Sequence, residues 1–368
     1  MEYLRESQLY TLSMALYAIY MDSAVHHILA ALGGWCNRQI DGSRVLAVLC
    51  REGAVARAWP RSLLYRLLRG LVNLPAFVLH RLYLALHVTF QDSFFARLAF
   101  EMGHETAVAQ SWLIMLLWVI PYSRWNNAYS LIGFSLLLAL FYVGAMPRQR
   151  FRLDLELVGF YPVLLFGAVF LAVAFSYVPG QSLRFLFYHI SAALCVLVTV
   201  SAVRNSEDLK RLAAGGGFCV LISSLYGVYQ RIQGVEVNES YVDLALNEGM
   251  PGRVESYFDN PNTFAEVLIL LLPLVLALVL CSRHVVSRLM AGGVLLVGVA
   301  ALGMTYSRAS WVGGACAMVV MVFLWKPRLI PAFAAACVLA VPFLPDTIWN
   351  RILTIANPAD SSTASRIP

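Results

Sequence analysis

From residue 107 onward the chain is built almost entirely of uncharged runs of 17–22 residues. A helix of about 20 apolar residues crosses the roughly 30 Å hydrocarbon core of a bilayer. Only the sixth run holds a charged residue, Glu266. The pattern predicts an all-α, polytopic membrane bundle over 107–345 with about nine spans: Ala107–Ser123, Trp125–Met146, Leu157–Val178, Phe185–Val203, Leu212–Gln230, Thr263–Ser282, Leu289–Ser307, Ala309–Trp325 and Leu329–Pro345.

The overall composition agrees with a membrane protein and excludes soluble, disordered and collagenous chains. Hydrophobic residues make up 60% and charged residues 13%, whereas soluble domains are about 25% charged. The net charge of +6 comes from 27 basic residues, all but two of them arginine. We interpret these as membrane-flanking residues and expect no nucleic-acid partner. No metal or cofactor motif is present, and Gly215–Gly217, inside an apolar run, predicts close helix packing.

The distribution of basic residues between alternate loops predicts the orientation. The set 147–156, 204–211, 283–288 and 326–328 holds 10 basic residues in 27 positions, and the other set holds 7 in 63. The positive-inside rule makes the first set cytoplasmic. We therefore expect a multi-pass membrane protein with a cytoplasmic N-terminus. Residues 231–262 and 346–368 then lie outside.

Residues 1–106 form a separate region with ten arginines. Within it, Pro60–Phe100 has the pattern of a basic amphipathic helix, interrupted at Pro75. Such a helix lies along a membrane surface with its apolar side among the lipids. We expect this region to be cytoplasmic and to rest on the inner leaflet.

Three arginines fall on the predicted outer side in polar surroundings. Arg253 lies in the segment Gly252–Asn262, Arg308 lies in the short turn Met304–Trp311, and Arg366 lies near the end of the chain. One interpretation is that these side chains only reach for lipid headgroups. The other is that they bind an anion, because a guanidinium bonds phosphate oxygens in a bidentate manner. A polyprenyl diphosphate sugar is an anionic ligand that lives in the membrane.

The start of the sixth span suits the same ligand. Asn260 is predicted to cap this helix, Pro261 fits its first turn, and Asn262 follows. The N–H groups of a helix N-terminus favour an anion. Glu266, one turn later, either orients Arg253 or accepts a proton from an acceptor hydroxyl, or it only complements the helix dipole.

These residues resemble a known family. The segment Gly252–Asn262 leading into Thr263–Leu280, followed by Met304–Trp311, is similar to the O-antigen ligase and O-antigen polymerase superfamily of bacterial envelope glycosyltransferases. The resemblance covers roughly 110–368 and is strongest over 250–368. The first hundred residues match no part of the family core.

The resemblance implies a metal-independent membrane glycosyltransferase. Such an enzyme moves a glycan from undecaprenyl diphosphate to a lipid, sugar or polymer acceptor outside the membrane. It implies that Arg253, Arg308 and Arg366 hold the donor diphosphate. Asn260, Asn262 and Glu266 are the supporting residues expected from the start of the sixth span itself. The resemblance also implies that the membrane is the bacterial cytoplasmic membrane and that residues 346–368 are the start of a truncated extracytoplasmic loop. The family's catalytic histidine lies in a large outer loop, and none of the seven histidines here is in a predicted outer loop. We expect that histidine beyond Pro368, in a longer chain of which this is a fragment.

Two other classes remain open from the sequence. A transporter or a flippase of lipid-linked saccharides has a similar composition, although ion-coupled transporters place ionisable residues at mid-membrane. Here only Glu266 and His189 lie within predicted spans, both near the outer end. A non-catalytic membrane scaffold is the second class. Ligase and polymerase share these motifs and are not separated.

Overall fold

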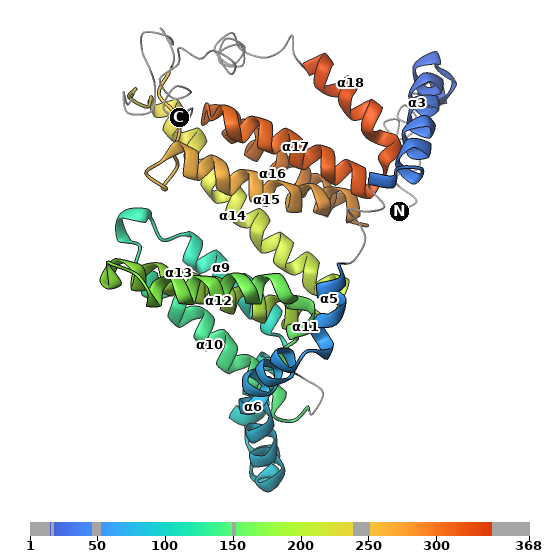
Figure 1. Cartoon of the computed structure of the whole chain (residues 1–368). Helices are drawn as coiled ribbons and strands as arrows, with labels where there is room; N and C mark the ends of the chain where they lie inside the picture. The colour runs from blue at the N-terminus through green and yellow to red at the C-terminus, as the bar shows by residue number, and fades with distance from the viewer. Residues whose placement is uncertain (1–14, 16–17, 46–52, 149–151, 238–250, 341–368) are drawn as a thin grey trace.

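A computed structural model describes residues 15, 18–45, 53–148, 152–237 and 251–340 (Figure 1). Every regular element within these ranges is a helix. The all-α prediction is therefore confirmed for the described residues. Arg366 and the predicted outer segment 346–368 lie outside them.

Six described helices are long and apolar enough to cross a membrane. They are α10 (Asn127–Ala145), α13 (Pro179–Ala202), α14 (Ser206–Gln233), α15 (Pro261–Cys281), α16 (Val285–Met304) and α17 (Arg308–Trp325). Their outward faces are strongly apolar, and Leu270, Leu289 and Leu296 are each 70–73% exposed. A soluble surface rarely carries so much contiguous apolar area. These features are those of a multi-pass membrane protein.

The predicted count of nine spans is not confirmed. The first and third runs form the shorter helices α9 (Thr106–Trp118) and α12 (Phe160–Ala174), and the ninth is described only as α18 (Ile330–Ala340). Pro121 follows the end of α9 by three residues, and a proline disfavours helical geometry at the residue before it. After α12, Pro179 is the first residue of α13. Thirteen residues rise only about 20 Å, less than the hydrocarbon thickness.

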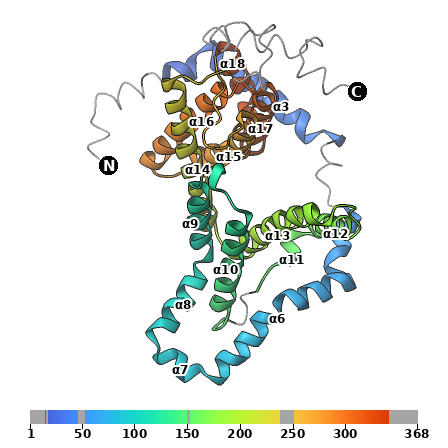
Figure 2. The same ribbon diagram turned by 90° about the vertical axis from the view of Figure 1, so that its left-hand side faces the viewer.

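The N-terminal helices also differ from the prediction. Pro75 does not interrupt the amphipathic segment, since it lies inside α6 (Leu63–Ala85). The boundaries come instead from serine caps, with Ser62 accepting from Tyr65 N–H and Ser93 from Ala96 N–H. After α6 come α7 (His87–Asp92) and α8 (Phe94–His104), which lead into α9 (Figure 2). Before α6, α5 (Ala54–Ala58) and the 3-10 helix η1 (Trp59–Arg61) are bent by 55° from it.

Helix α14 is the centre of the bundle. It packs against α9 on one side and against α15 and α16 on the other, and it crosses between the two groups of helices in Figure 1. Gly215–Gly217 are buried in it, and a Cβ on Gly215 would overlap the Ser111 hydroxyl of α9. The prediction that these glycines serve helix packing is confirmed.

The remaining short elements complete the two groups. Helix α3 (Ala24–Asp41) packs on α18 and on the 3-10 helix η3 (Pro327–Leu329). Helices α6 and α8 pack on α10, and α11 (Leu155–Val158) packs on α13. The 3-10 helix η2 (Tyr122–Arg124) follows α9.

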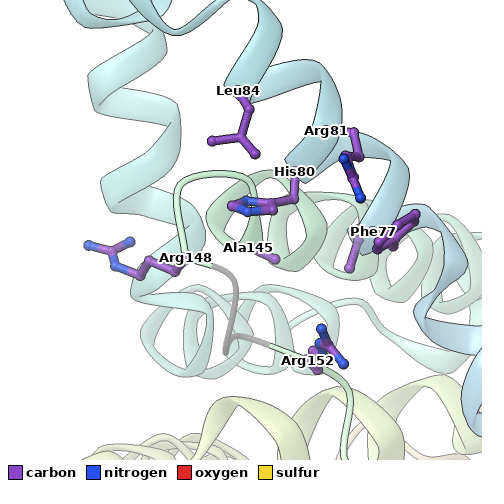
Figure 3. Close-up of a pocket in the computed structure, with 8 residues that line it drawn as sticks. Phe77, His80, Arg81, Leu84, Ala145, Arg148 and Arg152 are labelled. Atoms are coloured by element: carbon purple, nitrogen blue, oxygen red, sulfur yellow. The ribbon is translucent and has the colours of Figure 1, made fainter.

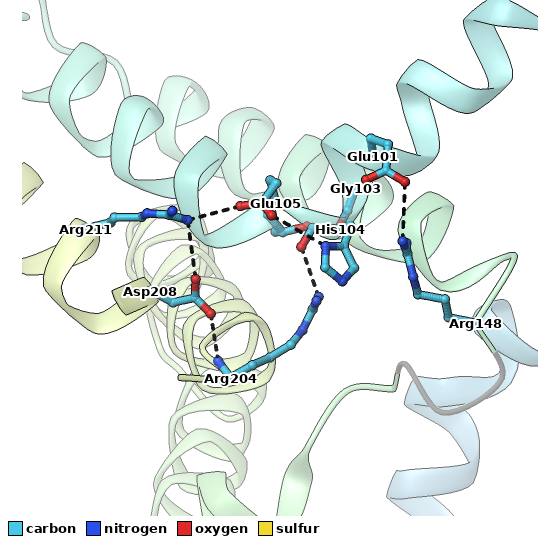
Figure 4. Close-up of polar contacts among 9 residues, drawn as sticks. Glu101, Gly103, His104, Glu105, Arg148, Arg204, Asp208 and Arg211 are labelled. Atoms are coloured by element: carbon cyan, nitrogen blue, oxygen red, sulfur yellow. Dashed lines mark hydrogen bonds and ion pairs between the residues drawn. The ribbon is translucent and has the colours of Figure 1, made fainter. Parts of the chain in front are cut away.

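Loops gather at two opposite ends of the bundle. At the Arg211 end, which comprises the start of α14 and the ends of α8 and α10, Arg211 bonds Glu105 at 3.3 Å and the Arg204 guanidinium donates to His104 O at 3.0 Å. Arg148 pairs with Glu101 at 3.4 Å in the same region (Figure 4). The opposite end is the Arg253 end, which comprises the end of α9, η2, residues 251–260 and the start of α15. There, Tyr122 N–H donates to Tyr257 O. Arg211 and Arg148 thus have acidic partners, and the Arg204 guanidinium bonds a backbone carbonyl.

Candidate functional site

The segment 251–260 is seated firmly between α14, α15 and α16 at the Arg253 end. Val254 N–H donates to Met304 O at 3.2 Å, and the Val254 side chain is fully buried in the core with Phe264. Gly252 lies so close to the Val235 carbonyl that an added Cβ would overlap it. Only glycine permits this approach, so the backbone places the next residue, Arg253, in the interior.

Arg253 is buried and cross-links two elements. Its side chain is 8% exposed, Nε donates to Thr305 O at 2.7 Å, and Nη2 donates to Asn262 Oδ1 at 2.6 Å. A buried charge is costly unless its donors are bonded. These bonds tie the start of α15 to the α16–α17 turn through one guanidinium.

Ser256 holds the same segment against α14. Its N–H and carbonyl form a pair of 2.8 Å bonds with the Gln230 amide, and its hydroxyl donates to Ser223 O at 2.8 Å. The side-chain amide of Gln230 thus satisfies both backbone polar groups of Ser256. Segment 251–260 is therefore fixed to the helices on both of its sides.

Backbone strain in the described residues is concentrated at this end. Only three non-glycine residues in the described ranges have positive φ: Ser256 at 55°, Asp259 at 53° and Tyr306 at 50°. All three lie in the two segments that Arg253 joins. Each costs about 1–3 kcal/mol and persists only where the surroundings enforce it, which is common at functional sites.

The start of α15 follows the sequence prediction with one correction. Asn260 caps the helix, accepting from Asn262 N–H at 2.8 Å and Thr263 N–H at 3.4 Å, and Pro261 is the first helical residue. The capping prediction is confirmed. The same bonds occupy two of the N–H groups that were expected to favour an anion. Asn262 contributes its side-chain oxygen to Arg253 instead.

Arg308 is the first residue of α17 and is partly exposed. The turn before it is ordered by bonds to Leu302 O, from the Thr305 hydroxyl at 2.7 Å and from the Trp311 indole at 2.9 Å. Because Arg253 bonds Thr305, the turn that carries Arg308 is held directly by Arg253. The structure thus brings two of the three predicted arginines to one turn.

Glu266 lies exposed on α15, one turn beyond Asn262. It forms no ion pair with the described residues. The α15 side chain that orients Arg253 is Asn262. Of the three roles predicted for Glu266, orientation of Arg253 is thus performed by Asn262.

Sequence reasoning missed an aromatic cavity beside this segment. The cavity has a volume of about 430 Å³ and lies between α9, η2, α10, α13 and residues 257–258. Seven aromatic residues form much of its wall: Trp118, Tyr122, Trp125, Phe134, Tyr188, Tyr257 and Phe258. Phe258 packs edge-on to Trp118 and stacks on Phe264. The signal in the sequence was the density of aromatic residues near the shared boundary of the first two apolar runs.

Glu255 and Tyr257, which follow Arg253 closely in the chain, have raised pKa values. Burial, and then the nearby Asp259 charge, raise the pKa of Glu255 above the ordinary carboxyl value. Burial also raises the pKa of Tyr257, whose hydroxyl is buried beside Ser223 and Trp118 without forming a hydrogen bond to a described residue. Among the described residues, no group of three potential ligands is arranged to hold a metal ion.

No family model matches this chain, and no curated protein or solved structure is similar to it at a significant level.

Proposed function

We propose that this protein is an O-antigen ligase-like or polymerase-like glycosyltransferase. It moves a glycan from undecaprenyl diphosphate to a lipid or saccharide acceptor on the extracytoplasmic face of the bacterial cytoplasmic membrane. The observation that carries the proposal is the hydrogen-bonded link between the two motif segments, 252–262 and 304–311. Arg253 bonds both Thr305 and Asn262, and all three strained residues of the described chain lie in these segments.

The burial of Arg253 gives the arginines different proposed roles. Arg308, which is partly exposed at a helix N-terminus, binds a donor phosphate directly, aided by the helix dipole. Arg253 holds the α16–α17 turn so that Arg308 is presented correctly. Arg366 is proposed as a third diphosphate ligand, on the basis of the sequence resemblance alone.

The aromatic cavity is proposed to receive the first isoprene units of the donor. Its lining is almost entirely apolar, with Ser130 as the one small polar residue among the described lining residues. Its wall includes Tyr257 and Phe258, which follow Arg253 closely in the chain. An apolar tail in this cavity would leave the diphosphate near segment 251–260.

The finer topology belongs to the same proposal. We place the Arg253 end outside the cytoplasm and the basic Arg211 end inside, following the positive-inside rule. Helices α9 and α12 are proposed to complete the predicted nine spans together with their irregular flanks. The N-terminal amphipathic helices then rest on the inner leaflet.

A flippase of lipid-linked saccharides is the second candidate function, because the aromatic cavity also suits a polyprenyl lipid in transit. A flippase moves the labelled donor between leaflets of a reconstituted vesicle without an acceptor. A transferase forms a new glycosidic product and leaves the leaflet distribution unchanged. A non-catalytic scaffold does neither.

The test is binding of a labelled undecaprenyl-diphosphate oligosaccharide to the full-length protein in vesicles. Arg308→Lys should weaken binding nearly as much as Arg308→Ala, at least 10-fold, because lysine keeps the charge but loses the bidentate fork. Arg184→Lys is the matched control, since Arg184 is an exposed arginine near the start of α13 at the same end. Unchanged binding by Arg308→Lys would make Arg308 a headgroup anchor and remove the diphosphate site.

A further inference from the structure

A second arginine-rich site lies at the opposite end of the protein. Two adjoining cavities of about 260 and 350 Å³ lie beside α6, and both are lined by Phe77 and Arg152. Their basic lining residues are Arg66, Arg69, His80, Arg81, Arg148 and Arg152. No carboxylate is among the described residues that line either cavity.

The walls of these cavities are fixed by bonds between α6 and the elements it packs against. The Tyr142 hydroxyl donates to Val72 O at 2.6 Å. The Asn73 amide pairs with the Leu153 backbone through bonds of 2.8 and 3.2 Å. Because Leu153 is held at both its N–H and its carbonyl, the neighbouring Arg152 is held between the two cavities.

His80 and the arginines are arranged around the first cavity (Figure 3). The His80 ring points toward Ala145, with its Nδ1 donating to Met146 O at 2.7 Å. Arg81 and Arg152 lie on one side of His80 and Arg148 lies on the other. Arg148 pairs with Glu101 through Nη2, while its Nη1 is buried without a hydrogen-bond partner.

Two of these arginines lie over aromatic rings. Arg81 lies over the Phe77 ring at 5.3 Å and Arg69 over the Tyr65 ring at 5.9 Å. Such contacts hold a guanidinium in place without neutralising it. Arg148 pairs with Glu101, whereas Arg69 and Arg81 keep a positive charge that an anionic ligand can complement.

An exposed apolar surface borders the same cavities. Helix α6 exposes large hydrophobic side chains along its length, among them Leu67, Leu71, Leu74, Phe77 and Leu84. Leu74, Phe77 and Leu84 also line the cavities. A ligand that complements both features has a phosphate group attached to apolar chains, which is the chemistry of an anionic phospholipid.

We propose that α6, together with Arg148 and Arg152, forms a binding site for the phosphate headgroup of an anionic phospholipid, with its acyl chains along the exposed side of α6. Arginine forks bond phosphate oxygens, and basic groups beside a membrane attract anionic lipids. The site is distinct from the donor site, which lies at the Arg253 end. It fixes α6, and through the Tyr142–Val72 bond the end of α10, to one leaflet.

The experiment is lipid titration of the full chain in neutral detergent, with bound lipid counted by native mass spectrometry. Phosphatidylglycerol should bind and raise the thermal midpoint, and phosphatidylcholine should not. The double variant Arg66→Gln/Arg81→Gln should weaken phosphatidylglycerol binding about 30-fold, the effect of removing two charges near a lipid surface. If that double variant aggregates, the variant Arg81→Gln/Arg152→Gln replaces it, because Arg152 lines both cavities. The same loss of phosphatidylglycerol binding is expected.

The matched control is Arg57→Gln/Arg97→Gln, which removes two exposed arginines of α5 and α8 that do not line the cavities. It should leave lipid binding unchanged. Equal loss in the control and in the cavity variants would overturn the proposal, since only net charge would then matter. Inorganic phosphate is added in a parallel titration. Stabilisation by phosphate equal to that by phosphatidylglycerol would assign the cavities to a soluble anion and also overturn it.

Discussion

Arg253 has the bonding of a structural cross-link, with consequences that separate it from Arg308. Its Nε and Nη2 reach Thr305 O and Asn262 Oδ1 in different directions. A lysine ammonium is a point donor on a longer flexible stem and does not reproduce this fork. The stability of the fold therefore depends on Arg253. It does not depend on Arg308, which lies at a partly exposed helix start.

The first prediction compares three variants by thermal unfolding in detergent. Arg253→Lys and Asn262→Ala should each lower the free energy of unfolding by about 1–3 kcal/mol, the cost of leaving a buried hydrogen-bonding group unsatisfied. Arg308→Lys should leave the thermal midpoint unchanged. If Arg253→Lys is as stable as the parent, the cross-link is unimportant and Arg253 is available for a ligand.

The second prediction concerns Glu255 and pH. Because burial and Asp259 raise its pKa, the folded state keeps this carboxyl protonated to a higher pH than the unfolded state does. The stabilising effect is complete at acid pH and is lost as pH rises from the ordinary carboxyl range through the raised value. Glu255→Gln should therefore raise the thermal midpoint at neutral pH and leave it unchanged in acid.

Glu236→Gln, which removes an exposed carboxylate near the end of α14, is the control for this comparison. It should shift the midpoint little at either pH. A stabilisation by Glu255→Gln that is the same at acid and neutral pH would show that ionisation of Glu255 is not the cause.

At the residue scale, sequence alone predicts contacts that are local in the chain. Asn260 as a cap and Pro261 as the first helical residue follow from helix chemistry within four positions. The burial of Arg253 does not follow from local helix chemistry, because it depends on Val254 pairing with Met304, fifty residues away. The sequence identifies the residues of the candidate site but not their bonding partners.

Helices α8 and α10 cross with their backbones in close contact. A Cβ on Gly103 would overlap backbone atoms of Gly144 and Leu140, and a Cβ on Gly144 would overlap the backbone of Gly103. Backbone atoms cannot move aside as a flexible side chain can. The two helices can pack at this distance only because both positions are glycine.

The third prediction follows from this crossing. Gly103→Ala should destabilise the protein by about 1–3 kcal/mol through overpacking, seen as a lower thermal midpoint and less monodisperse protein in gel filtration. Gly292→Ala in α16 is the matched control, because a Cβ there meets nothing within 4 Å. Equal behaviour of the two variants would mean that α8 and α10 are further apart than described.

At the element scale, hydrophobic runs predict which segments are helical better than where helices end. The runs that became α10 and α13–α17 were located correctly, because their apolar length dominates. The end of α9 near Pro121 and the continuity of α6 through Pro75 were not predicted correctly. Proline lacks an N–H and disfavours helix at the preceding residue, yet helix α6 tolerates it while α9 does not extend to it.

For the whole molecule, the central fact is the position of α14 between two groups of helices. Half of its apolar window is buried, against 17–28% for the other long helices. No periodicity in the sequence distinguishes it, and the buried glycines 215–217 are the only local clue. Which helices it separates depends on long-range packing that a single sequence does not encode visibly.

The fourth prediction is topological. Reporter fusions after Arg152, Arg211 and Arg288 should be cytoplasmic, because these loops are rich in basic residues. Fusions after Asn247 and Asn357, positions outside the described residues, should be extracytoplasmic. A cytoplasmic signal at 247 would put the Arg253 end in the wrong compartment for a glycan transferase.

The most direct measurement is photo-crosslinking of the full-length protein in vesicles with an undecaprenyl-diphosphate oligosaccharide that carries a photoreactive group beside the diphosphate. We predict labelled peptides that cover 252–262 and 304–311, the two segments that Arg253 joins. Excess unlabelled undecaprenyl diphosphate should abolish the label, and undecaprenol should not. Labelling confined to the Arg211 end, or unaffected by the competitor, would contradict a donor site at Arg253 and Arg308.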